Sequence, residues 1–330
     1  MTATTDAANA KARVDLLISC DWGTSAFRLR AVEDPSGKVV ASTRSDYGIT
    51  AAFSDWQRSE LPEPQRAGFY RSILYGAIDD LQRQHSLDLH GATILLSGMV
   101  SSSLGIQELP YHPLPFDVSG ADLRPAVLPA TMDFPHTILL VPGIRSHDDV
   151  IRGEETQLIG CRPPVEKQER VFIFPGTHSK HITIREGRAV AFTTYMTGEF
   201  FNLLAQRSLL AVSVAKPSSA AVTTAFYAGI DAARDSSILR GAFSVRTNQL
   251  FKRLGKEDNY QYLSGLLIGE ELKAIGHRPI TLVSSGPLLS SYQAALQYLG
   301  APPIQTIDAD NALIRGHAIL WKATVVGKIH

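Results

Sequence analysis

Residues Val14–Ser42 read VDLLISCDWGTSAFRLRAVEDPSGKVVAS, and residues Arg170–Tyr195 read RVFIFPGTHSKHITIREGRAVAFTTY. Each segment has an apolar run, a turn of small residues, a strand of alternating apolar and polar residues, a second turn and a third strand. Alternation with a period of two, bounded by Gly, Pro and Asp, is typical of β-hairpins. The chain is therefore predicted to repeat one three-stranded unit, with one copy in each half.

The first turn of each copy is rich in glycine and small hydroxyl residues. It reads DWGTS at residues 21–25 and PGTHS at residues 175–179. Glycine lets backbone N–H groups approach an anion closely, and Thr or Ser adds a side-chain donor. Two such tips facing each other would clamp a polyphosphate from both sides. The candidate phosphate-binding residues are Gly23, Thr24, Ser25, Gly176, Thr177 and His178.

Three charged residues flank these tips. Asp21 directly follows an apolar strand, and a carboxylate beside a phosphate calls for a Mg²⁺ ion between them. The alternative is a turn-starting Asp that caps its own loop. Arg28 and Lys180 are cations within reach of a phosphate, or else solvated strand residues. Asp21 is thus the predicted metal ligand, and Arg28 and Lys180 are predicted to contact phosphate.

The segment RGEETQ, residues 152–157, lies between the two copies and contains the candidate bases. Phosphoryl transfer needs a group that accepts the proton of the substrate hydroxyl and orients it. Glu154 or Glu155 fits this role, and Glu154 is preferred. The alternative is that both carboxylates only stabilise the dipole of the helix that begins here.

Two further segments are candidates for small-molecule contacts. The loop at residues 97–115 is long and rich in Ser and Gly, as in loops that hold small polyols. Arg145 and Arg152 suit a carboxylate. In the turn VSSGP at residues 283–287, Ser285 and Gly286 would let an adenine or ribose lie against the backbone.

The chain of 330 residues is long enough for two domains. The expected boundaries are a disordered tail at 1–13, a first domain at 14–165 and a second at 166–330, with a linker at 162–169. A final helix is expected at 310–323, and its return towards the first domain is left open. Each half is predicted to be α/β with a mixed sheet. Neither G-x-G-x-x-G after a strand nor a P-loop motif occurs. Further helices are expected at 63–84, 198–210, 224–234, 259–275 and 289–299, and further strands at 93–96, 136–141, 280–284 and 304–307.

Composition narrows the class of protein. Lys plus Arg (32) equals Asp plus Glu (32), so no basic field recruits nucleic acid or a membrane surface. No apolar run approaches the roughly 20 residues of a membrane span, and no signal peptide is recognisable. Cys20 and Cys161 are predicted to be buried free thiols. A cytoplasmic protein is expected.

Several strings together carry a resemblance. The D-x-G-T-S-x-x-x-R turn, the P-G-T turn and the S-G-P turn resemble the phosphate and adenosine motifs of the sugar kinase, actin and heat-shock ATPase superfamily. Within it the chain is similar to the 2-keto-3-deoxygalactonokinase family from about Leu17 to about Ile319. The strings that carry this likeness are SCDWGTSAFRLR, LSGMVSSSLGIQELPYHPLP, VIRGEETQLIG, FPGTHSKHI, YMTGEFFNLL and YLSGLLIGEEL.

The resemblance implies duplicated ribonuclease H-like (actin-like ATPase) domains with mixed sheets and a central cleft. It also implies a kinase that uses ATP and Mg²⁺ to phosphorylate the terminal hydroxyl of 2-dehydro-3-deoxy-D-galactonate in galactonate catabolism. By position, Asp21 would hold the metal, the two tips would cradle the phosphates, and Ser285-Gly286 would line the nucleotide. The sugar acid would contact Met99, Ser101, Ser102 and Ser103. Related sugar kinases use Asp as base, whereas this chain offers Glu.

Other functions remain open at this point. The same fold could phosphorylate another sugar or an amino sugar, or could be a nucleotide-binding switch without an acceptor. The long loop at 97–115 favours an acceptor site, since a switch needs none. The expected partners are a sugar acid and ATP, without nucleic acid or membrane, and a homodimer is left open.

Overall fold

A computed structural model describes residues 15–219 and 221–326, so the predicted tail at 1–13 lies outside the described residues. The chain divides into two compact units. Of the described residues, the N-terminal unit comprises 15–110, 124–142 and 317–326, and the C-terminal unit comprises 111–123, 143–219 and 221–316. The predicted division at 165 separates the two sequence repeats, whereas these units follow packing, so residues 143–165 belong with the second unit.

The N-terminal unit contains a six-stranded sheet of β3 (Val39–Ser45), β2 (Phe27–Asp34), β1 (Asp15–Trp22), β4 (Ile94–Gly98), β8 (Ile138–Leu140) and β7 (Ala126–Leu128), in that order. The first three strands pair antiparallel, while β1, β4 and β8 run parallel. The register of the first hairpin places Trp22 opposite Phe27. The predicted three-stranded unit and the strand at 93–96 are confirmed.

The C-terminal unit repeats this arrangement. Its six-stranded sheet is β15 (Ile304–Ile307), β14 (Ile280–Val283), β11 (Arg170–Phe174), β12 (Ser179–Arg185), β13 (Arg188–Tyr195) and β6 (Phe116–Asp117), in that order. β11 pairs antiparallel with β12 and parallel with β14, as β1 does with β2 and β4. Both sheets are mixed, and both contain three antiparallel strands followed by two parallel ones. The predicted duplicated α/β fold is therefore confirmed.

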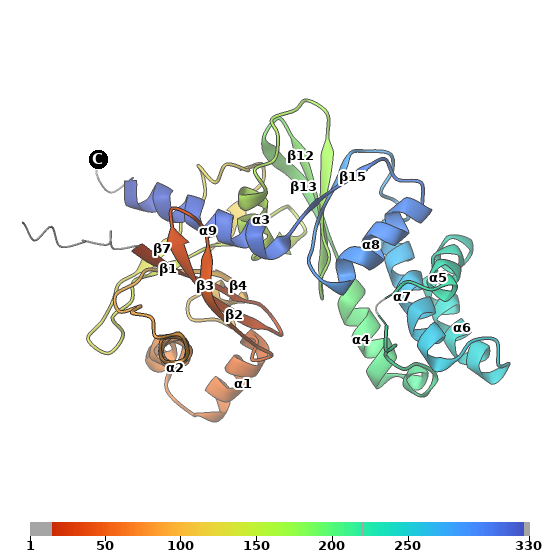
Figure 1. The fold of residues 1–330 in the computed structure, drawn as a ribbon, viewed down its shortest axis with the longest axis horizontal. Coiled ribbons are helices and arrows are strands. Elements are labelled where there is room, and N and C mark those ends of the chain that lie inside the picture. The colour runs from red at the N-terminus through yellow and green to blue at the C-terminus, as the bar shows by residue number, and fades with distance from the viewer. Residues whose placement is uncertain (1–14, 220, 327–330) are drawn as a thin grey trace, which may run out of the picture. The chain divides into compact units, whose positions relative to one another are not determined.

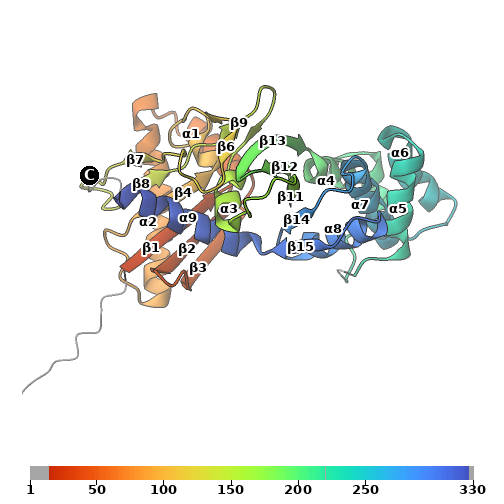
Figure 2. The same cartoon turned by 90° about the horizontal axis from the view of Figure 1, so that it is seen from above.

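Helices cover both faces of the first sheet (Figures 1 and 2). α1 (Ile49–Arg58) and α2 (Arg66–His85) cover one face, and α2 continues a short 3-10 turn, η1 (Glu63–Gln65). Trp321 of α9 (Ala309–Val326) packs on the other face against apolar side chains of β1, β4 and β8. α1 was not predicted, although its buried residues are Ile49, Ala52 and Trp56, an amphipathic spacing.

The C-terminal unit is richer in helices. α3 (Glu154–Cys161), α4 (Thr197–Arg207), η3 (Leu209–Ser213), α5 (Thr224–Asp235), α6 (Ile238–Leu250), α7 (Lys256–Leu272) and α8 (Pro287–Tyr298) all belong to it. Side chains of α5, α7 and α8 form the core with β11 and β14, and Figure 1 shows α5, α6 and α7 packed side by side. α6 was missed because it buries only Gly241 and Val245, so its apolar residues do not mark a buried face.

The segment at 97–115 is more ordered than the predicted loop. It includes the end of β4, the 3-10 turn η2 (Met99–Ser101) and β5 (His112–Pro113). β5 joins β9 (Ile144–Arg145) and β10 (Val150–Ile151) in a small three-stranded sheet. These short strands left no pattern in the sequence because two or three residues are too few for alternation to be recognised.

Both cysteines, which were predicted to be buried free thiols, lie within the described residues. Cys20 is a buried free thiol, as predicted, whereas Cys161 is free but only half-buried. Burial raises the pKa of Cys161 to about 12.

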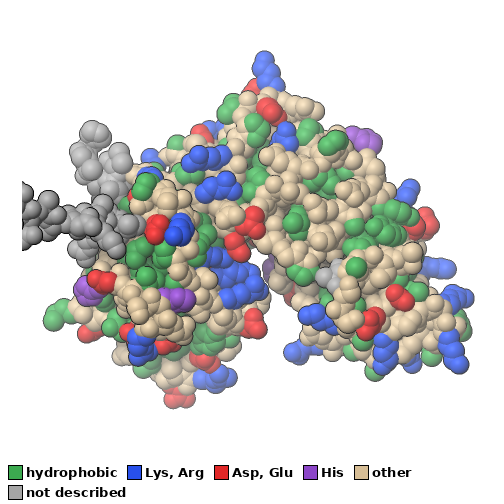
Figure 3. Space-filling model, viewed as in Figure 1, with side chains coloured by type: hydrophobic (Ala, Val, Ile, Leu, Met, Phe, Trp, Pro, Cys, Tyr) green, Lys and Arg blue, Asp and Glu red, His purple; other side chains and the backbone are tan. Residues whose placement is uncertain are grey.

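Within residues 15–219 and 221–326 no helix is long and apolar enough to cross a membrane. Figure 3 shows acidic and basic side chains interspersed over the face in view.

Candidate active site

The first predicted phosphate tip lies at the end of the β1–β2 hairpin. Asp21 stands opposite Arg28, and Arg28 Nη1 donates a hydrogen bond of 2.7 Å to Asp21 Oδ2. A hydrogen bond of 2.9 Å from Gly23 N to Ala26 O closes the tip. The predicted metal ligand and the predicted phosphate cation of this unit therefore form one ion pair.

The start of α1 is hydrogen-bonded to the backbone of this tip. Ile49 N donates to Gly23 O at 2.9 Å, and Thr50 N donates to Thr24 O at 3.3 Å. A Cβ atom on Gly48 would overlap the backbone oxygen of Thr24, so glycine is required at this contact. The tip is thus held by backbone contacts from a helix that the sequence analysis did not identify.

Gly98 lies against the other side of Asp21. Its φ of +92° favours glycine, and a Cβ there would lie 2.7 Å from Trp22 O and 3.2 Å from Asp21 Oδ1. On the neighbouring strand, the exposed Arg44 stands opposite Arg28, and Figure 3 shows basic side chains gathered over β2 and β3. The surroundings of Asp21 therefore combine close backbone approach with positive charge, which suits an anionic ligand.

A buried histidine links the strands that end at this site. His317 of α9 contacts Ser19 Oγ of β1 through Nδ1 at 2.8 Å and Ser97 Oγ of β4 through Nε2 at 3.0 Å. Burial, and secondarily the charge of Arg30, lowers the pKa of His317 to about 3. The neutral ring donates from one nitrogen and accepts at the other, so it connects both hydroxyls. No motif in the sequence pointed to this residue.

The second predicted tip lies between β11 and β12. Lys180 Nζ donates to His178 O at 2.9 Å and forms an ion pair of 2.8 Å with Glu154 Oε1. The side chains of Lys180 and Glu154 are only 11% and 17% exposed, so the pair is largely shielded from solvent. The structure therefore brings the second tip, its predicted cation and one predicted base together within the C-terminal unit.

The two candidate bases differ in their contacts. Glu155 is buried, and its carboxylate accepts from Gly153 N at 2.6 Å and from Thr156 Oγ1 at 2.9 Å. Burial, and secondarily the neighbouring charge of Glu154, raises the pKa of Glu155 to about 7. Glu154 Oε1 is bound to Lys180, while Glu154 Oε2 is buried and has no hydrogen-bond partner among the described residues. Of the two glutamates, Glu154 is therefore the one with an oxygen that no described residue hydrogen-bonds.

The second tip rests on the start of α4, as the first rests on α1. Glu199 N donates to Thr177 O at 3.0 Å. A Cβ on Gly198 would overlap Gly176 O and lie 2.8 Å from Thr177 Cα. The Glu199 carboxylate lies 2.5 Å from Nε2 of His178. Gly198 and Glu199 belong to the family string YMTGEFFNLL, but the string alone predicted no role for either residue.

A buried carboxylate anchors the strand that leaves this tip. Glu271 of α7 is 2% exposed, and its Oε1 accepts from Ser179 Oγ at 2.6 Å and from His181 Nε2 at 2.9 Å. Its Oε2 accepts from Tyr292 OH at 2.6 Å and from Thr197 Oγ1. Burial alone would raise the pKa of Glu271, but these hydrogen bonds and the His181 charge outweigh it and lower the pKa. Glu271 therefore joins β12, α4 and α8 at one point.

The predicted acceptor residues lie in and after η2. Ser101 and Ser102 are buried, and their hydroxyls donate to Gly98 O at 3.3 Å and to Met99 O at 2.6 Å. Ser102 Oγ also accepts from Leu104 N at 3.2 Å. These hydroxyls therefore hold the loop in shape, and of the four predicted acceptor residues only Ser103 is exposed.

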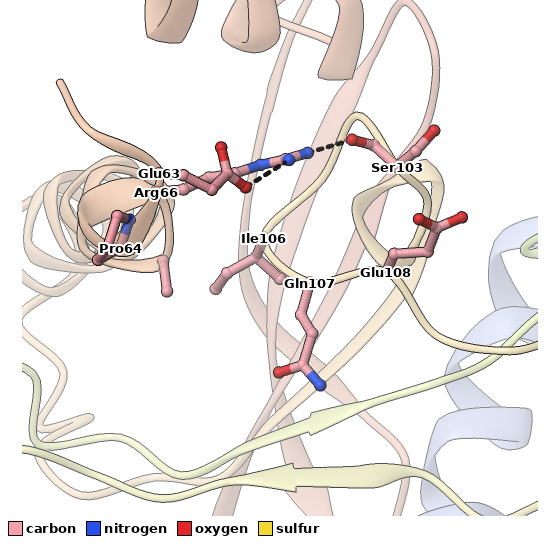
Figure 4. Close-up of a pocket in the computed structure, with 8 residues that line it drawn as sticks. Glu63, Pro64, Arg66, Ser103, Ile106, Gln107 and Glu108 are labelled. Carbon is pink, nitrogen blue, oxygen red and sulfur yellow. Dashed lines mark hydrogen bonds and ion pairs between the residues drawn. The ribbon is translucent and has the colours of Figure 1, made fainter.

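Ser103 lies on the rim of a pocket of about 310 Å³ in the N-terminal unit. Figure 4 shows Arg66 running between Glu63 and Ser103, with an ion pair of 3.0 Å to Glu63 Oε1 and a hydrogen bond to Ser103 O. The pocket does not include the other predicted acceptor residues. Its lining residues are Glu63, Pro64, Arg66, Ala67, Ser103, Ile106, Gln107 and Glu108.

The two arginines predicted to bind a carboxylate have different environments. Arg145 of β9 is exposed. Arg152 is 8% exposed, and its guanidinium lies 4.0 Å from the centre of the Tyr111 ring. Stacking on an aromatic ring orients a guanidinium and leaves its in-plane N–H groups for ligands. Arg152 is thus the better oriented of the two.

The predicted adenosine turn lies between β14 and α8. Ser285 Oγ donates to Asp308 Oδ2 at 2.8 Å and accepts from Ala309 N at 3.2 Å. Gly286 has a φ of +68° and immediately precedes α8. The Ser285 side chain therefore ties this turn to the start of α9, and the glycine exposes its backbone.

No group of three or more His, Cys, Asp or Glu side chains that could hold a metal occurs in the described parts of the chain. This suits Mg²⁺, which is commonly bound by one or two carboxylates together with substrate phosphates and waters. A single carboxylate at the first tip, Asp21, is compatible with that ligand set.

Three comparisons identify relatives. A family model described as 2-keto-3-deoxy-galactonokinase matches residues 21–320. The 2-dehydro-3-deoxygalactonokinase of Escherichia coli (strain K12) is 33% identical over 311 residues, which cover 91% of this chain and 95% of the relative. A probable 2-dehydro-3-deoxygalactonokinase of Rhizobium meliloti (strain 1021) is 32% identical over 308 residues, 90% of this chain and 93% of the relative.

A solved structure agrees with these sequence matches. The crystal structure of a protein from Sinorhizobium meliloti, assigned to 2-dehydro-3-deoxygalactonokinase, has a TM-score of 0.79 and 30% identity. The alignment covers 93% of this chain and 96% of that structure. The match thus extends over nearly the whole chain, including both tips, the RGEET segment and the adenosine turn. The chain belongs to the 2-keto-3-deoxygalactonokinase family.

Proposed function

We propose that this chain transfers the terminal phosphoryl group of ATP to the terminal hydroxyl of 2-dehydro-3-deoxy-D-galactonate, a step of galactonate catabolism. The observation that carries the proposal is the family match over residues 21–320, together with relatives of 32% and 33% identity. The duplicated Gly-Thr tips supply what a kinase needs, because backbone and hydroxyl donors on hairpin tips suit a polyphosphate.

Phosphate contacts are assigned to both tips. At the first tip the phosphates would contact Gly23, Thr24, Ser25 and Arg28. At the second tip they would contact Gly176, Thr177, His178 and Lys180. Asp21 would hold Mg²⁺, and that ion would neutralise charge on the phosphates. Arg28 donates to Asp21 Oδ2 and so fixes the direction of this carboxylate at the tip. Ser285 and Gly286 are proposed to contact the nucleoside.

Glu154 is proposed as the base that orients the acceptor hydroxyl. Two observations support it over Glu155. Lys180 holds one oxygen of Glu154, and the other has no partner among the described residues, whereas both Glu155 oxygens accept hydrogen bonds from its own turn. The proton of the hydroxyl would move to Glu154 Oε2 as the hydroxyl oxygen forms a bond to the γ-phosphorus and the bond from that phosphorus to the leaving ADP oxygen breaks.

The acceptor is proposed to contact the segment Met99 to Ser103, with its carboxylate on an arginine. Arg152 is the first choice because the Tyr111 ring orients its guanidinium, and Arg145 is the second. A carboxylate-binding arginine separates sugar acids from neutral sugars and amino sugars, because only a sugar acid offers the guanidinium an anionic partner.

A substrate panel tests the proposal. Purified protein is mixed with Mg²⁺-ATP and, in turn, 2-dehydro-3-deoxy-D-galactonate, other aldonates and 2-keto-3-deoxy sugar acids, neutral ketoses and amino sugars. ADP release is followed, and product mass is measured. The expected result is a phosphorylated product from the first substrate and little from neutral or amino sugars. ATP hydrolysis that no acceptor accelerates would instead favour a nucleotide-dependent switch.

Two further assignments belong to this proposal. A kinase draws on the ATP of the cytoplasm, so we place the protein there. A homodimer stays a prediction, and sedimentation equilibrium over a range of protein concentrations tests it.

A further inference from the structure

The second tip contains a pair of residues that the first tip lacks. Nε2 of His178 lies 2.5 Å from Glu199 Oε2, and the two side chains are 32% and 39% exposed. Nδ1 of the same ring makes no hydrogen bond among the described residues. The corresponding position of the first tip is Ser25, and the α1 residues bonded to that tip are Ile49 and Thr50, neither of which is a carboxylate. In both units the start of a helix contacts the tip through its backbone, and the pair of His178 and Glu199 is found only at the second tip.

The backbone gives Glu199 a defined position. Its N–H donates to Thr177 O at 3.0 Å, and the preceding Gly198 lies in contact with Gly176 and Thr177. The backbone of Glu199 is thus hydrogen-bonded to the same tip that its carboxylate contacts. It does not reach His178 from a mobile surface segment.

The proton positions follow from the partners. An ionised carboxylate only accepts hydrogen bonds, so Nε2 of His178 carries the hydrogen in this contact. A neutral ring would then present the lone pair of Nδ1, which repels a phosphate oxygen. A protonated ring donates from both nitrogens, to Glu199 on one side and to a phosphate on the other.

We propose that Glu199 is a positioning residue for phosphoryl transfer: it holds the His178 ring so that Nδ1–H donates to a phosphate oxygen of ATP. The inference rests on the proposed kinase function and deepens it. It assigns a role to the YMTGEF string, of which Thr197 also binds Glu271. Glu199 itself touches neither ATP nor the acceptor in this role.

A purely structural role is the competing explanation. Glu199 lies in the first turn of α4, where a carboxylate stabilises the helix dipole. Loss of that effect would lower the melting temperature and leave the kinetics for ATP unchanged. The two roles are therefore separated by the ATP dependence of the reaction and by the coupling between Glu199 and His178.

The experiment is a double-mutant cycle on the full chain. Glu199→Ala, His178→Ala and the double variant are compared with wild type for kcat, KM for ATP, and Kd for a non-hydrolysable ATP analogue. Glu199→Gln tests rescue, since its Oε1 still accepts from Nε2–H. Glu270→Ala is the matched control, because Glu270 is 34% exposed and forms an ion pair of 2.8 Å with Lys273. Melting temperatures are measured for all variants.

Each single alanine variant is expected to lower kcat/KM for ATP by about 10- to 100-fold, the range for a charge-assisted hydrogen bond. The double variant should be no worse than His178→Ala, because Glu199 acts through that ring. Glu199→Gln should recover part of the loss, and Glu270→Ala should match wild type. Additive losses, or an active Glu199→Ala variant with unchanged ATP kinetics, would overturn the positioning role alone. A wild-type protein without acceptor phosphorylation would instead refute the proposed function.

Discussion

Lys180 Nζ lies 2.8 Å from Glu154 Oε1, and this ion pair joins the strand that leaves the second phosphate tip to the first turn of α3. One cation therefore contacts both a predicted base and, through His178 O, the predicted phosphate tip. A change at either end of the pair is expected to affect the other, because the two side chains are largely shielded from solvent.

The first prediction compares the two glutamates. Glu154→Gln is expected to lower kcat by about 100- to 10,000-fold, the usual contribution of a positioned base, with Kd for ATP unchanged. Glu155→Gln should have a much smaller effect on kcat, since both its oxygens serve the turn. Steady-state kinetics of both folded variants checks this. A large loss in Glu155→Gln alone would move the base assignment to the residue whose pKa is raised to about 7.

The second prediction concerns Lys180. Lys180→Met keeps the length of the side chain but leaves Glu154 as an uncompensated, largely buried charge. Glu154 should then favour its neutral form, so kcat at neutral pH should fall and recover partly at higher pH. The pH–rate profile of the variant is the measurement. Lys180→Arg is the matched control and should retain the wild-type profile more closely; equal profiles for wild type and Lys180→Met would contradict the coupling.

The third prediction concerns Asp21. Asp21→Asn should lower kcat by roughly two to four orders of magnitude and weaken the response to Mg²⁺, because metal-assisted charge neutralisation contributes several kcal/mol. Asp34→Asn, at the other end of the same hairpin, is the control, since Asp34 forms an ion pair of 3.3 Å with Lys322. Turnover is titrated with Mg²⁺ for both. Near-wild-type turnover in folded Asp21→Asn would remove Asp21 from the site.

The fourth prediction is a pH dependence of stability. The pKa of Glu271 is lowered in the folded protein, so its carboxylate contributes stability above the ordinary carboxyl pKa of about 4.3. That contribution is lost as the pH falls through the lowered pKa. Glu271→Gln should therefore cost about 1–3 kcal/mol near pH 7 and progressively less in acid. Denaturant unfolding between pH 7 and pH 3 measures both curves; a difference independent of pH would argue against an ionised Glu271.

The fifth prediction uses glycine packing. Gly198→Ala should displace the second tip, because its Cβ would lie 2.8 Å from Thr177 Cα. Displacements near 1 Å cost up to about 100-fold in rate, so kcat/KM for ATP should fall by at least about tenfold. Gly76→Ala, in the exposed part of α2 with nothing within 4 Å, is the control and should stabilise the protein slightly. An unchanged kcat/KM in Gly198→Ala would show that the tip tolerates the shift.

Much of the fold could be predicted from local patterns. The turn residues around Gly23 and Gly176 and the alternation after them predicted both hairpins, and the observed registers confirm them. Helix α2 was predicted by its spacing, and its bounds agree closely with the expected ones. α6 was missed because its large apolar residues, including Leu239 and Phe243, remain exposed, so the sequence pattern does not report a buried face.

The candidate site was predictable only in part, because some of its features are local in the sequence and others depend on tertiary contacts. The sequence by itself determined the residue types at both tips, the glycines that allow close backbone approach, and the pair Glu154 and Glu155, because these are local features. It could not determine which glutamate forms an ion pair with Lys180. Nor could it show that Glu199 contacts His178, or that Glu271 accepts hydrogen bonds from side chains of three other elements. Those contacts depend on how helices pack on strands, and packing is set by the whole core rather than by neighbours in the chain.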